Sequence, residues 1–426
     1  MKDSGIQWVG KIPDNWKVGK VKNLFKERKN KNKGLVEKNL LSLSYGNIVR
    51  KNINTTFGLL PESFETYNRI EDGDIVFRLT DLQNDKKSLR TGLCTEKGII
   101  TSAYTVLIPP ENTNPAYLHY LFHSFDICKV FYNLGDGVRQ GMNYDDLGKL
   151  SILLPPQDQQ KKIADFLDSK CSELQSAIDN TKQTIEEYKK LKQAVITKAV
   201  TKGLEPNRKM KDSGIEWIGE IPENWEVCKV RHLGSLQNGI SKGGDSFGKG
   251  FPFVSYGDVY KNYSIPEKVI GLVETDEEEQ ERYSVQKGDI FFTRTSETIE
   301  EVGFSSVCEK TIDKATFAGF LIRLRPSRKE IDTGYAKYYF RSNHNRYYLV
   351  KEMNLVTRAS LGQGLLNDMP VCYPPLSEQK SIAEYLDSKC SQIDTLISQK
   401  EQFITELEKY KQSLIYEYVT GKRVLN

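Results

Sequence analysis

The chain repeats itself, and this repeat constrains its fold more than any other feature of the sequence. The segment from Met1 to Leu24, MKDSGIQWVGKIPDNWKVGKVKNL, which we call the leading segment, returns with few changes between Met210 and Leu233. The segment PPQDQQKKIADFLDSKC, which begins at Pro155, returns at Pro374 as PPLSEQKSIAEYLDSKC. Since each unit of a repeat folds as a module, the sequence predicts two modules of one architecture. A chain of 426 residues is long enough for both modules to bury an apolar core.

The interiors of the two units differ, although short landmarks recur in the same order. The tetrapeptide SYGN at 44–47 corresponds to SYGD at 255–258, and GDIVF at 73–77 corresponds to GDIFF at 288–292. A constant frame around a variable interior is what a modular reader needs. A recent duplication whose loops drifted would leave the same pattern.

After each Pro-Pro pair, apolar residues recur at alternating spacings of four and three, which is the a/d pattern of a coiled coil. We therefore expect two long helices, at 156–203 and 374–426, each of roughly 45 helical residues. Gly203 and Gly421 provide the glycine at which each helix ends. Stripes this long are best buried against each other, with some apolar surface left for other chains. The predicted seam is Leu167, Leu174, Ile178, Ile185, Leu386, Ile393, Ile397, Ile404 and Leu407.

The segments before the two helices have a different pattern. Short runs such as 104–108 and 320–324 are rich in β-branched and aromatic residues and read as strands, whereas 116–122 has helical periodicity. The predicted fold class is α+β, with two mixed α/β domains in tandem repeat and two long helices. The predicted divisions are 1–155 for the first domain with its leading segment, 156–203 for the first helix, 204–373 for the second leading segment and domain, and 374–426 for the second helix.

No catalytic site is predicted. A DNA methyltransferase needs a glycine-rich turn for its methyl donor and an Asn/Asp-Pro-Pro-aromatic motif for the flipped base. The Pro-Pro pairs here follow Ile108, Leu154 and Tyr373, and the Gly-x-Gly at 362–364 stands alone. We therefore expect no enzyme activity from this chain.

No metal site is predicted either. His119 and His123 lie four residues apart on an expected helix, which could place two imidazoles on one ion. Their counterparts in the second unit are Lys337 and Arg341. Cations can replace histidines on a solvated or phosphate-facing surface, but they cannot ligate zinc.

Composition narrows the class of protein further. The net charge of +4 and the isoelectric point of about 8.4 permit nucleic-acid binding without requiring it. No stretch approaches the roughly 20 apolar residues of a membrane span. The N-terminal segment lacks the apolar run of a secretory signal, and the seven cysteines show no Cys-x-x-Cys spacing. We expect a cytoplasmic protein.

The repeated motifs carry a family resemblance. Gly-x-x-Trp-x-Gly-x-Ile-Pro-x-x-Trp stands in each leading segment, at 5–16 and 214–225, and each variable domain is followed by Pro-Pro-x-x-x-Gln and a long heptad helix. In this order the motifs resemble the specificity subunits of bacterial and archaeal Type I restriction-modification systems. The resemblance covers essentially the whole chain, and the ordered repetition is far more specific than any one motif.

The resemblance implies a non-catalytic, DNA-binding subunit of a restriction system. Two target recognition domains would be held apart by an antiparallel pair of helices, each domain reading one half of a split site in double-stranded DNA. The helices would dock two methyltransferase subunits, and restriction subunits would join through that core. S-adenosylmethionine, ATP and Mg would belong to those partners. The assembled complex would make N6-methyladenine on protected DNA and cut unprotected DNA as a site-specific endonuclease.

Sequence-selective DNA binding needs side chains that reach base edges, and lysines and arginines that hold the backbone. We expect such side chains beside turns, where loops can enter a groove. In the first domain the candidates are Tyr45, Asn47, Arg78, Thr80, Arg139, Gln140 and Asn143. In the second domain the candidates are Tyr256, Asp258, Arg294, Thr295, Ser296, Arg358, Ser360 and Gln363.

A second hypothesis comes from another class of protein. A coiled-coil scaffold whose domains bind other proteins would also explain the helices and the modest charge. It explains less well why basic and aromatic loops recur within divergent domains. Salt-sensitive association with duplex DNA separates the two hypotheses, because phosphate contacts release counterions.

Overall fold

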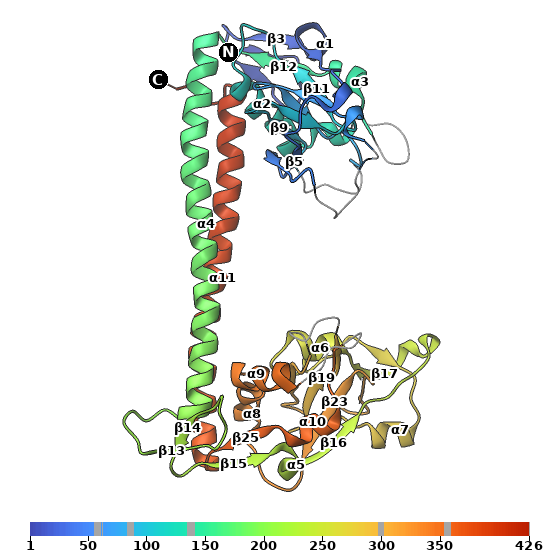
Figure 1. Cartoon of the computed structure of the whole chain (residues 1–426), viewed down its shortest axis with the longest axis vertical. Coiled ribbons are helices and arrows are strands. Elements are labelled where there is room, and N and C mark those ends of the chain that lie inside the picture. The colour runs from blue at the N-terminus through green and yellow to red at the C-terminus, as the bar shows by residue number, and fades with distance from the viewer. Residues whose placement is uncertain are drawn as a thin grey trace. The chain divides into compact units, whose positions relative to one another are not determined.

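The computed structural model of the chain describes residues 1–54, 61, 63–82, 89–133, 141–296, 302–352 and 359–425. These residues form two compact units. The first contains residues 1–182 and 401–426, and the second contains residues 183–400. Each unit therefore combines one leading segment, one divergent domain and a part of each long helix (Figure 1).

The two long helices are α4 (Gln157–Lys202, 46 residues) and α11 (Leu376–Val419, 44 residues), which lie side by side (Figure 1). In the first unit, Lys411 Nζ donates to Gln175 Oε1 at 3.1 Å, and in the second unit Lys192 Nζ pairs with Asp394 at 2.6 Å. The residue number on one helix falls as the number on the other rises, so the helices are antiparallel. The predicted α+β class with two packed long helices is confirmed.

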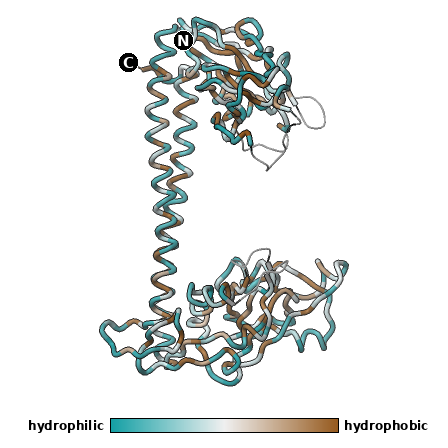
Figure 2. Tube along the Cα trace, viewed as in Figure 1, coloured by the Kyte–Doolittle hydropathy of each residue, from teal (hydrophilic) through white to brown (hydrophobic). Residues whose placement is uncertain are grey.

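The heptad stripes lie where the two helices meet. Figure 2 shows apolar and polar residues alternating along both helices, while the interiors of the domains are richer in apolar residues. The buried seam residues are Leu167, Ile178, Ile185, Leu386 and Ile393. The partly buried seam residues are Leu174, Ile397, Ile404 and Leu407. No helix among the described residues is both long enough and apolar enough to cross a membrane.

The domain of the first unit is built on an antiparallel sheet of four strands in the order β4-β11-β8-β9. The helix α2 follows β11, and its buried face joins the core on this sheet. The elements before α4 are β1 (Lys2–Asp3), β2 (Lys11–Ile12), β3 (Lys17–Lys20), α1 (Val21–Leu24), β4 (Lys26–Glu27), β5 (Leu41–Ser44), β6 (Asn47–Arg50), β7 (Asn68–Ile70), β8 (Ile75–Phe77), β9 (Thr91–Leu93), β10 (Gly98–Ile100), β11 (Thr105–Ile108), α2 (Pro115–Ile127), α3 (Tyr144–Gly148) and β12 (Ser151–Leu154), with short 3-10 turns at Lys33–Leu35, Phe64–Thr66 and Val130–Asn133.

The domain of the second unit uses the same plan, with four strands in the order β16-β23-β19-β21. A smaller sheet, β18-β17-β22, is packed beside it. The elements between the long helices are β13 (Met210–Asp212), β14 (Glu220–Pro222), β15 (Glu226–Lys229), α5 (Val230–Leu233), β16 (Gly234–Asn238), β17 (Phe247–Val254), α6 (Tyr256–Lys261), β18 (Leu272–Val273), α7 (Glu277–Arg282), β19 (Ile290–Thr293), β20 (Thr295–Ser296), β21 (Ser305–Val307), β22 (Thr316–Phe317), β23 (Leu321–Pro326), α8 (Thr333–Tyr339), α9 (Asn343–Glu352), β24 (Ala359–Ser360), α10 (Gln363–Asp368) and β25 (Pro370–Tyr373), with a 3-10 turn at Gly244–Ser246.

Each leading segment forms a hairpin that holds the start of a long helix. The strands β1 and β2 pair in the first unit, and β13 and β14 pair in the second. The second tryptophan of each leading segment is buried and donates its indole N–H to the first turn of the helix. Trp16 Nε1 donates to Gln159 Oε1 at 3.1 Å, and Trp225 Nε1 donates to Glu378 Oε2 at 2.9 Å. This bond explains why the leading segment and the helix recur together.

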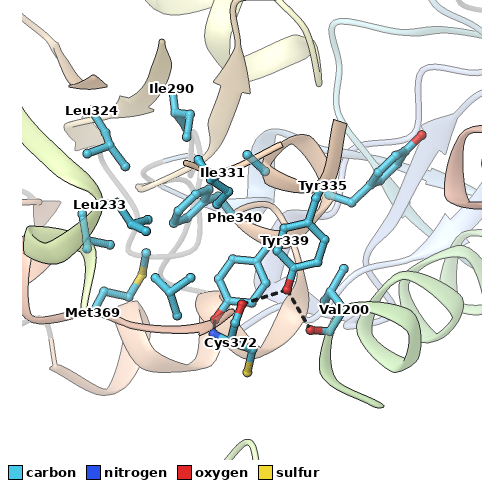
Figure 3. Close-up of a cluster of buried hydrophobic side chains, with 14 of the residues drawn as sticks. Val200, Leu233, Ile290, Leu324, Ile331, Tyr335, Tyr339, Phe340, Met369 and Cys372 are labelled. Carbon is cyan, nitrogen blue, oxygen red and sulfur yellow. Dashed lines mark hydrogen bonds between the residues drawn. The ribbon is translucent and has the colours of Figure 1, made fainter. Parts of the chain in front are cut away.

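A buried tyrosine ties each domain to the far end of the other helix. The hydroxyl of Tyr335 donates to the carbonyls of Cys372 (2.9 Å) and Val200 (3.2 Å), as Figure 3 shows. In the first unit, Tyr117 donates in the same way to the carbonyls of Leu153 and Val419. The core of each unit includes side chains of its leading segment, its sheet and both helices. The helices are therefore part of the platform that holds each sheet in place.

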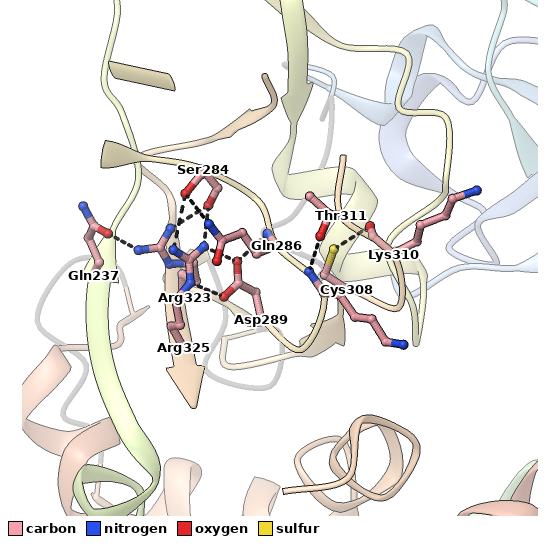
Figure 4. A network of polar contacts seen from close by, with 10 residues as sticks. Gln237, Ser284, Gln286, Asp289, Cys308, Lys310, Thr311, Arg323 and Arg325 are labelled. Carbon is pink, nitrogen blue, oxygen red and sulfur yellow. Dashed lines mark hydrogen bonds and ion pairs between the residues drawn. The ribbon is translucent and has the colours of Figure 1, made fainter. Parts of the chain in front are cut away.

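The repeated Gly-Asp landmark forms a turn around a buried carboxylate. Arg325 donates to Asp289 from Nε (2.7 Å) and Nη2 (2.6 Å), and the N–H of Gln286 donates to the same carboxylate at 2.7 Å (Figure 4). The first domain has the equivalent pair Arg28 and Asp74 at 3.0 Å, although Arg28 follows β4 whereas Arg325 lies in β23. Burial raises the pKa of the Asp74 carboxyl, and the hydrogen bond from Arg28 opposes that effect. The landmark therefore has a structural role.

Candidate nucleic-acid interface

One end of the main sheet in the second domain gathers several predicted DNA contacts. Thr293 ends β19 opposite Leu321, which begins β23. The N–H of the next residue, Arg294, donates to the Phe320 carbonyl at 2.9 Å, and the carbonyl of Arg294 accepts from the Leu361 N–H at 2.7 Å. Among the described residues, the partly exposed guanidinium of Arg294 has no hydrogen-bond or ion-pair partner. The backbone of Arg294 is therefore fixed by hydrogen bonds, while the charge of its side chain is available to a ligand.

Three further candidates lie around Arg294. Thr295 pairs with Ser360 across the short strands β20 and β24. Gln363 begins α10, and its Nε2 donates to Oδ1 of Asn238, the last residue of β16, at 2.9 Å. Residues far apart in the sequence therefore meet at one sheet end and offer hydroxyl, amide and guanidinium groups. The side chain of Ser296 and all of Arg358 lie outside the described residues.

The first domain positions its candidates with a buried arginine. The N–H of Arg78 donates to the carbonyl of Arg90 at 2.8 Å. The fully buried guanidinium of Arg90 donates to the carbonyls of Thr80 (2.6 Å) and Asp81 (3.1 Å), so it fixes the loop that follows β8. The backbone N–H of Arg90 donates to Asp126, and burial raises the pKa of that carboxyl to about 7. Arg90 was not predicted from the sequence, because these contacts come from tertiary structure and leave no local pattern.

An exposed tyrosine projects from a tight hairpin near this loop. Tyr45 (φ 47°) and Gly46 (φ 80°) connect β5 to β6 in the left-handed conformation typical of a type I′ turn. A Cβ on Gly46 would lie 2.9 Å from the Leu89 side chain, so the turn is packed beside the residue before Arg90. Tyr45 is 78% exposed, and Asn47 is exposed too. Holding a tyrosine at this positive φ costs about 1 kcal/mol or more, and such strain is concentrated at functional sites.

Asn143 lies in the same region, although it is far from Arg78 in the sequence. The N–H of Met142 donates to the carbonyl of Leu79 at 2.8 Å, which places Asn143 beside the Arg78–Thr80 segment. The side chain of Asn143 is exposed, and its Oδ1 caps α3 by accepting from the N–H of Asp146. Arg139 and Gln140 lie outside the described residues.

The other repeated landmark takes different structures in the two domains. SYGN at 44–47 forms the hairpin turn, whereas SYGD at 255–258 begins the helix α6. Asp258 accepts from the N–H (2.8 Å) and the hydroxyl (2.7 Å) of Ser255 in a capping box, and Tyr256 stacks on Tyr260 at 5.9 Å. The carboxylate of Asp258 is thus occupied by helix capping. Tyr256 and Asp258 stay predictions, and both side chains already have contacts within α6.

Backbone hydrogen bonds also show which residues of the two domains correspond to each other. The hydrogen bond from the Met142 N–H to the Leu79 carbonyl in the first unit is equivalent to the bond from the Leu361 N–H to the Arg294 carbonyl in the second unit. Arg294 therefore corresponds to Leu79, and the arginine of the first domain, Arg78, stands one position earlier. The same frame therefore presents arginines at different positions in the two domains.

The two histidines of the first domain are partly buried. His119 and His123 are four residues apart on α2, with ring centroids 6.0 Å apart. Burial lowers the pKa of His119 to about 4 and the pKa of His123 to about 3. Across the described parts of the chain, no three His, Cys, Asp or Glu side chains cluster in a way that could hold a metal ion.

These partly buried imidazoles predict a stability that depends on pH. The folded pKa of each is below the ordinary value of 6.5, so the folded state binds fewer protons than the unfolded chain. The stabilisation is complete above about pH 6.5 and is lost as pH falls through about 4 for His119 and about 3 for His123. His119→Gln/His123→Gln should flatten the fall of the unfolding temperature over that window. Thermal melts of the wild-type chain, of this variant and of His232→Gln, a surface control, provide the test. Equal slopes of unfolding temperature against pH in all three proteins would contradict the prediction.

Comparison with protein families gives a match over both units. Residues 13–187 and 222–408 match the family model described as Type I restriction modification DNA specificity domain. The chain is similar to the putative type I restriction enzyme MjaX specificity subunit of Methanocaldococcus jannaschii, with 24% identity over 97% of this chain and 95% of that protein. It is also similar to the EcoKI specificity subunit of Escherichia coli (strain K12), with 25% identity over 64% of this chain and 58% of that protein.

Solved structures show the same fold. A chain from a structure that describes complex assembly and conformational transition of the type I R-M system aligns with a TM-score of 0.72 and 16% identity, over 97% of this chain and all (100%) of that one. The HsdS subunit from Thermoanaerobacter tengcongensis aligns with a TM-score of 0.52 and 15% identity, over 99% of this chain and 100% of that one.

Proposed function

Since this chain belongs to the family of DNA specificity subunits of Type I restriction-modification systems, we propose that its two domains read the two halves of a split DNA site. Within that family the chain is a non-catalytic component of the complex, and the cofactors belong to the methyltransferase and restriction subunits. Membership also decides between the two hypotheses raised by the sequence, because it makes DNA specificity the function of the domains.

The observation that carries the proposal is the cluster of Arg294, Thr295, Ser360 and Gln363 at one sheet end. The major groove distinguishes all four base pairs by hydrogen-bond donors and acceptors, and arginine is the commonest specific partner of guanine. In the first domain, Tyr45, Asn47, Arg78, Thr80 and Asn143 form the equivalent proposed contact set. Arg139, Gln140, Ser296 and Arg358 remain candidates for both readout and phosphate contact.

The proposed partners are double-stranded DNA, two methyltransferase subunits and restriction subunits in the cytoplasm. We assign reading to 1–155 and 204–373, and docking to the helical segments 156–203 and 374–426. The family membership and the partly exposed seam residues Leu174, Ile397, Ile404 and Leu407 support this division. Apolar side chains that two helices cover incompletely can be covered by a partner's helix.

Mapping of N6-methyladenine tests the reading function. Cells would express the methyltransferase subunit of the system with and without this chain, and long-read sequencing would locate the modified adenines. We expect a split motif with one modified adenine on each strand, and we expect it to vanish without the chain. An identical methylation map in both cells would refute the reading function.

Arg294→Ala should relax specificity at one base pair of one half-site. Loss of a bidentate contact costs about 1–3 kcal/mol of discrimination, which is roughly 5- to 150-fold. The measurement is the methylated motif of the variant, in which one position should become degenerate while the other half-site stays intact. Arg282→Ala, which removes an exposed arginine on α7 of the same domain, should leave the motif unchanged. An unaltered motif in both variants would show that Arg294 reads no base.

A further inference from the structure

Phe320 is an exposed aromatic residue beside the cluster of Arg294, Thr295, Ser360 and Gln363 in the second domain. Its side chain is 64% exposed, whereas most large apolar side chains of this domain are buried in two clusters. Its carbonyl accepts the Arg294 N–H, so the two residues extend the pairing of β19 and β23 by one step. Residues opposite each other on neighbouring strands have Cβ atoms about 5 Å apart. Phe320 and Arg294 therefore present an apolar and a cationic group to the same place.

The turn that carries Phe320 is held firmly on both sides. The N–H of Leu321 donates to the Ala318 carbonyl at 2.9 Å and closes the turn. The Gly319 N–H donates to Ile240 at 2.8 Å, and the Ala318 N–H donates to Val254 at 3.0 Å. A Cβ on Gly319 would lie 2.4 Å from Ser241 Oγ, so a larger residue here would require the Ser241 side chain to move. A rigid turn loses little conformational entropy when its exposed side chain is buried against a ligand.

The first domain has the same turn with a different side chain. The Tyr104 N–H donates to the Thr101 carbonyl at 3.2 Å, just as Leu321 donates to Ala318, and β11 pairs with β8 as β23 pairs with β19. In this register Phe320 corresponds to Ala103, which is exposed. The backbone of the turn is common to both domains, whereas the side chain that it presents is not. A position of this kind suits discrimination between half-sites.

We propose that Phe320 contacts the C5 methyl group of a thymine in the half-site read by the second domain. The thymine methyl is the apolar group that the major groove offers, and aromatic side chains pack against it. Covering an exposed phenyl ring removes apolar surface from water, which is favourable at about 25 cal/mol per Å². The adjacent Arg294 is suited to the hydrogen-bonding groups of the same groove. This inference rests on the proposed reading function and names one element of its specificity.

Deoxyuridine provides a direct probe, because it differs from thymidine only by the missing methyl group. The wild-type chain and Phe320→Ala, each assembled with its methyltransferase subunits, would be titrated with duplexes that carry the mapped site. In these duplexes, each thymine of the second half-site would be replaced in turn by deoxyuridine. We expect one replacement to weaken wild-type binding about fivefold and to leave Phe320→Ala binding unchanged. Phe320→Leu, which keeps an apolar side chain, should retain part of the discrimination.

Each outcome decides the proposal. The proposal is overturned if Phe320→Ala weakens binding to all DNA sequences equally, or if every deoxyuridine replacement changes binding of the wild-type and Phe320→Ala complexes alike. It is also overturned if the half-site holds no thymine. Impaired assembly with the methyltransferase would identify a protein contact instead and would also overturn it. Ile270→Ala is the matched control, because Ile270 is 95% exposed and precedes β18 in the other sheet of the domain. Failure of the reading function is distinguishable, since the wild-type complex would then show no preference for the site over unrelated duplex.

Discussion

Replacing Asp289 with alanine should destabilise the second unit by about 3–5 kcal/mol, the cost of removing one partner of a buried ion pair. Asp289 is 1% exposed and accepts from Arg325 and from the backbone of Gln286. Arg323, 5% exposed, lies beside the pair, and burial lowers the pKa of its guanidinium to about 10. The variant would leave two arginines in a largely buried site without the carboxylate that balances them. It would also leave the Gln286 N–H unpaired.

Chemical unfolding of the chain measures this effect. Asp289→Asn should lose less than Asp289→Ala, because an amide oxygen still accepts from the Gln286 N–H although the charge is gone. Glu274→Ala is the surface control. Its ion pair with Lys249 leaves both side chains more than half exposed (54% and 60%), and such pairs contribute about 0–1 kcal/mol. Equal losses in Asp289→Ala and Glu274→Ala would show that the buried pair adds nothing to stability.

The sequence was most informative where the structure is regular. Alternating spacings of four and three predicted both long helices and their packing, because a buried stripe on a helix has a fixed period. Gly203 and Gly421 have φ values of 74° and 68°, as expected of residues that end a helix. The structural role of the leading segment was not predictable from the sequence, because the hydrogen bond from Trp16 to Gln159 joins residues that are 143 positions apart.

The candidate site shows where sequence reasoning fails. SYGN and SYGD look equivalent, yet Asp258 completes a capping box that starts a helix, whereas Tyr45 and Gly46 take a hairpin turn. One landmark therefore takes two different structures in the two domains. Arg90 and Phe320 were missed for a different reason. A buried arginine that fixes a loop and an exposed phenylalanine beside a cation are recognisable only when the strand register is known.

The second large effect is expected at the end of the helix seam that lies in the second unit, near the start of α11. Leu386 is fully buried (0% exposed) in a cluster with Trp225 of the second leading segment, Ile196 of α4 and Phe292 of β19. Truncating a leucine in such a core costs about 2–5 kcal/mol, through lost transfer free energy and the cavity left behind. Leu386→Ala should therefore lower the free energy of unfolding by that amount. Leu396→Ala should cost much less, because Leu396 on the same helix is 40% exposed.

Hydrogen exchange would show how far the damage extends. The cluster around Leu386 joins both helices to the sheet, so Leu386→Ala should reduce protection in β15, β25 and α8 together with α11. Loss of protection confined to α11 would mean that the domain has a core independent of the helices. Leu167, the counterpart on α4, is also 0% exposed and should give the same pattern in the first unit. A seam residue would then affect DNA reading without touching DNA, because the sheet end that carries Arg294 is held in place through the helices.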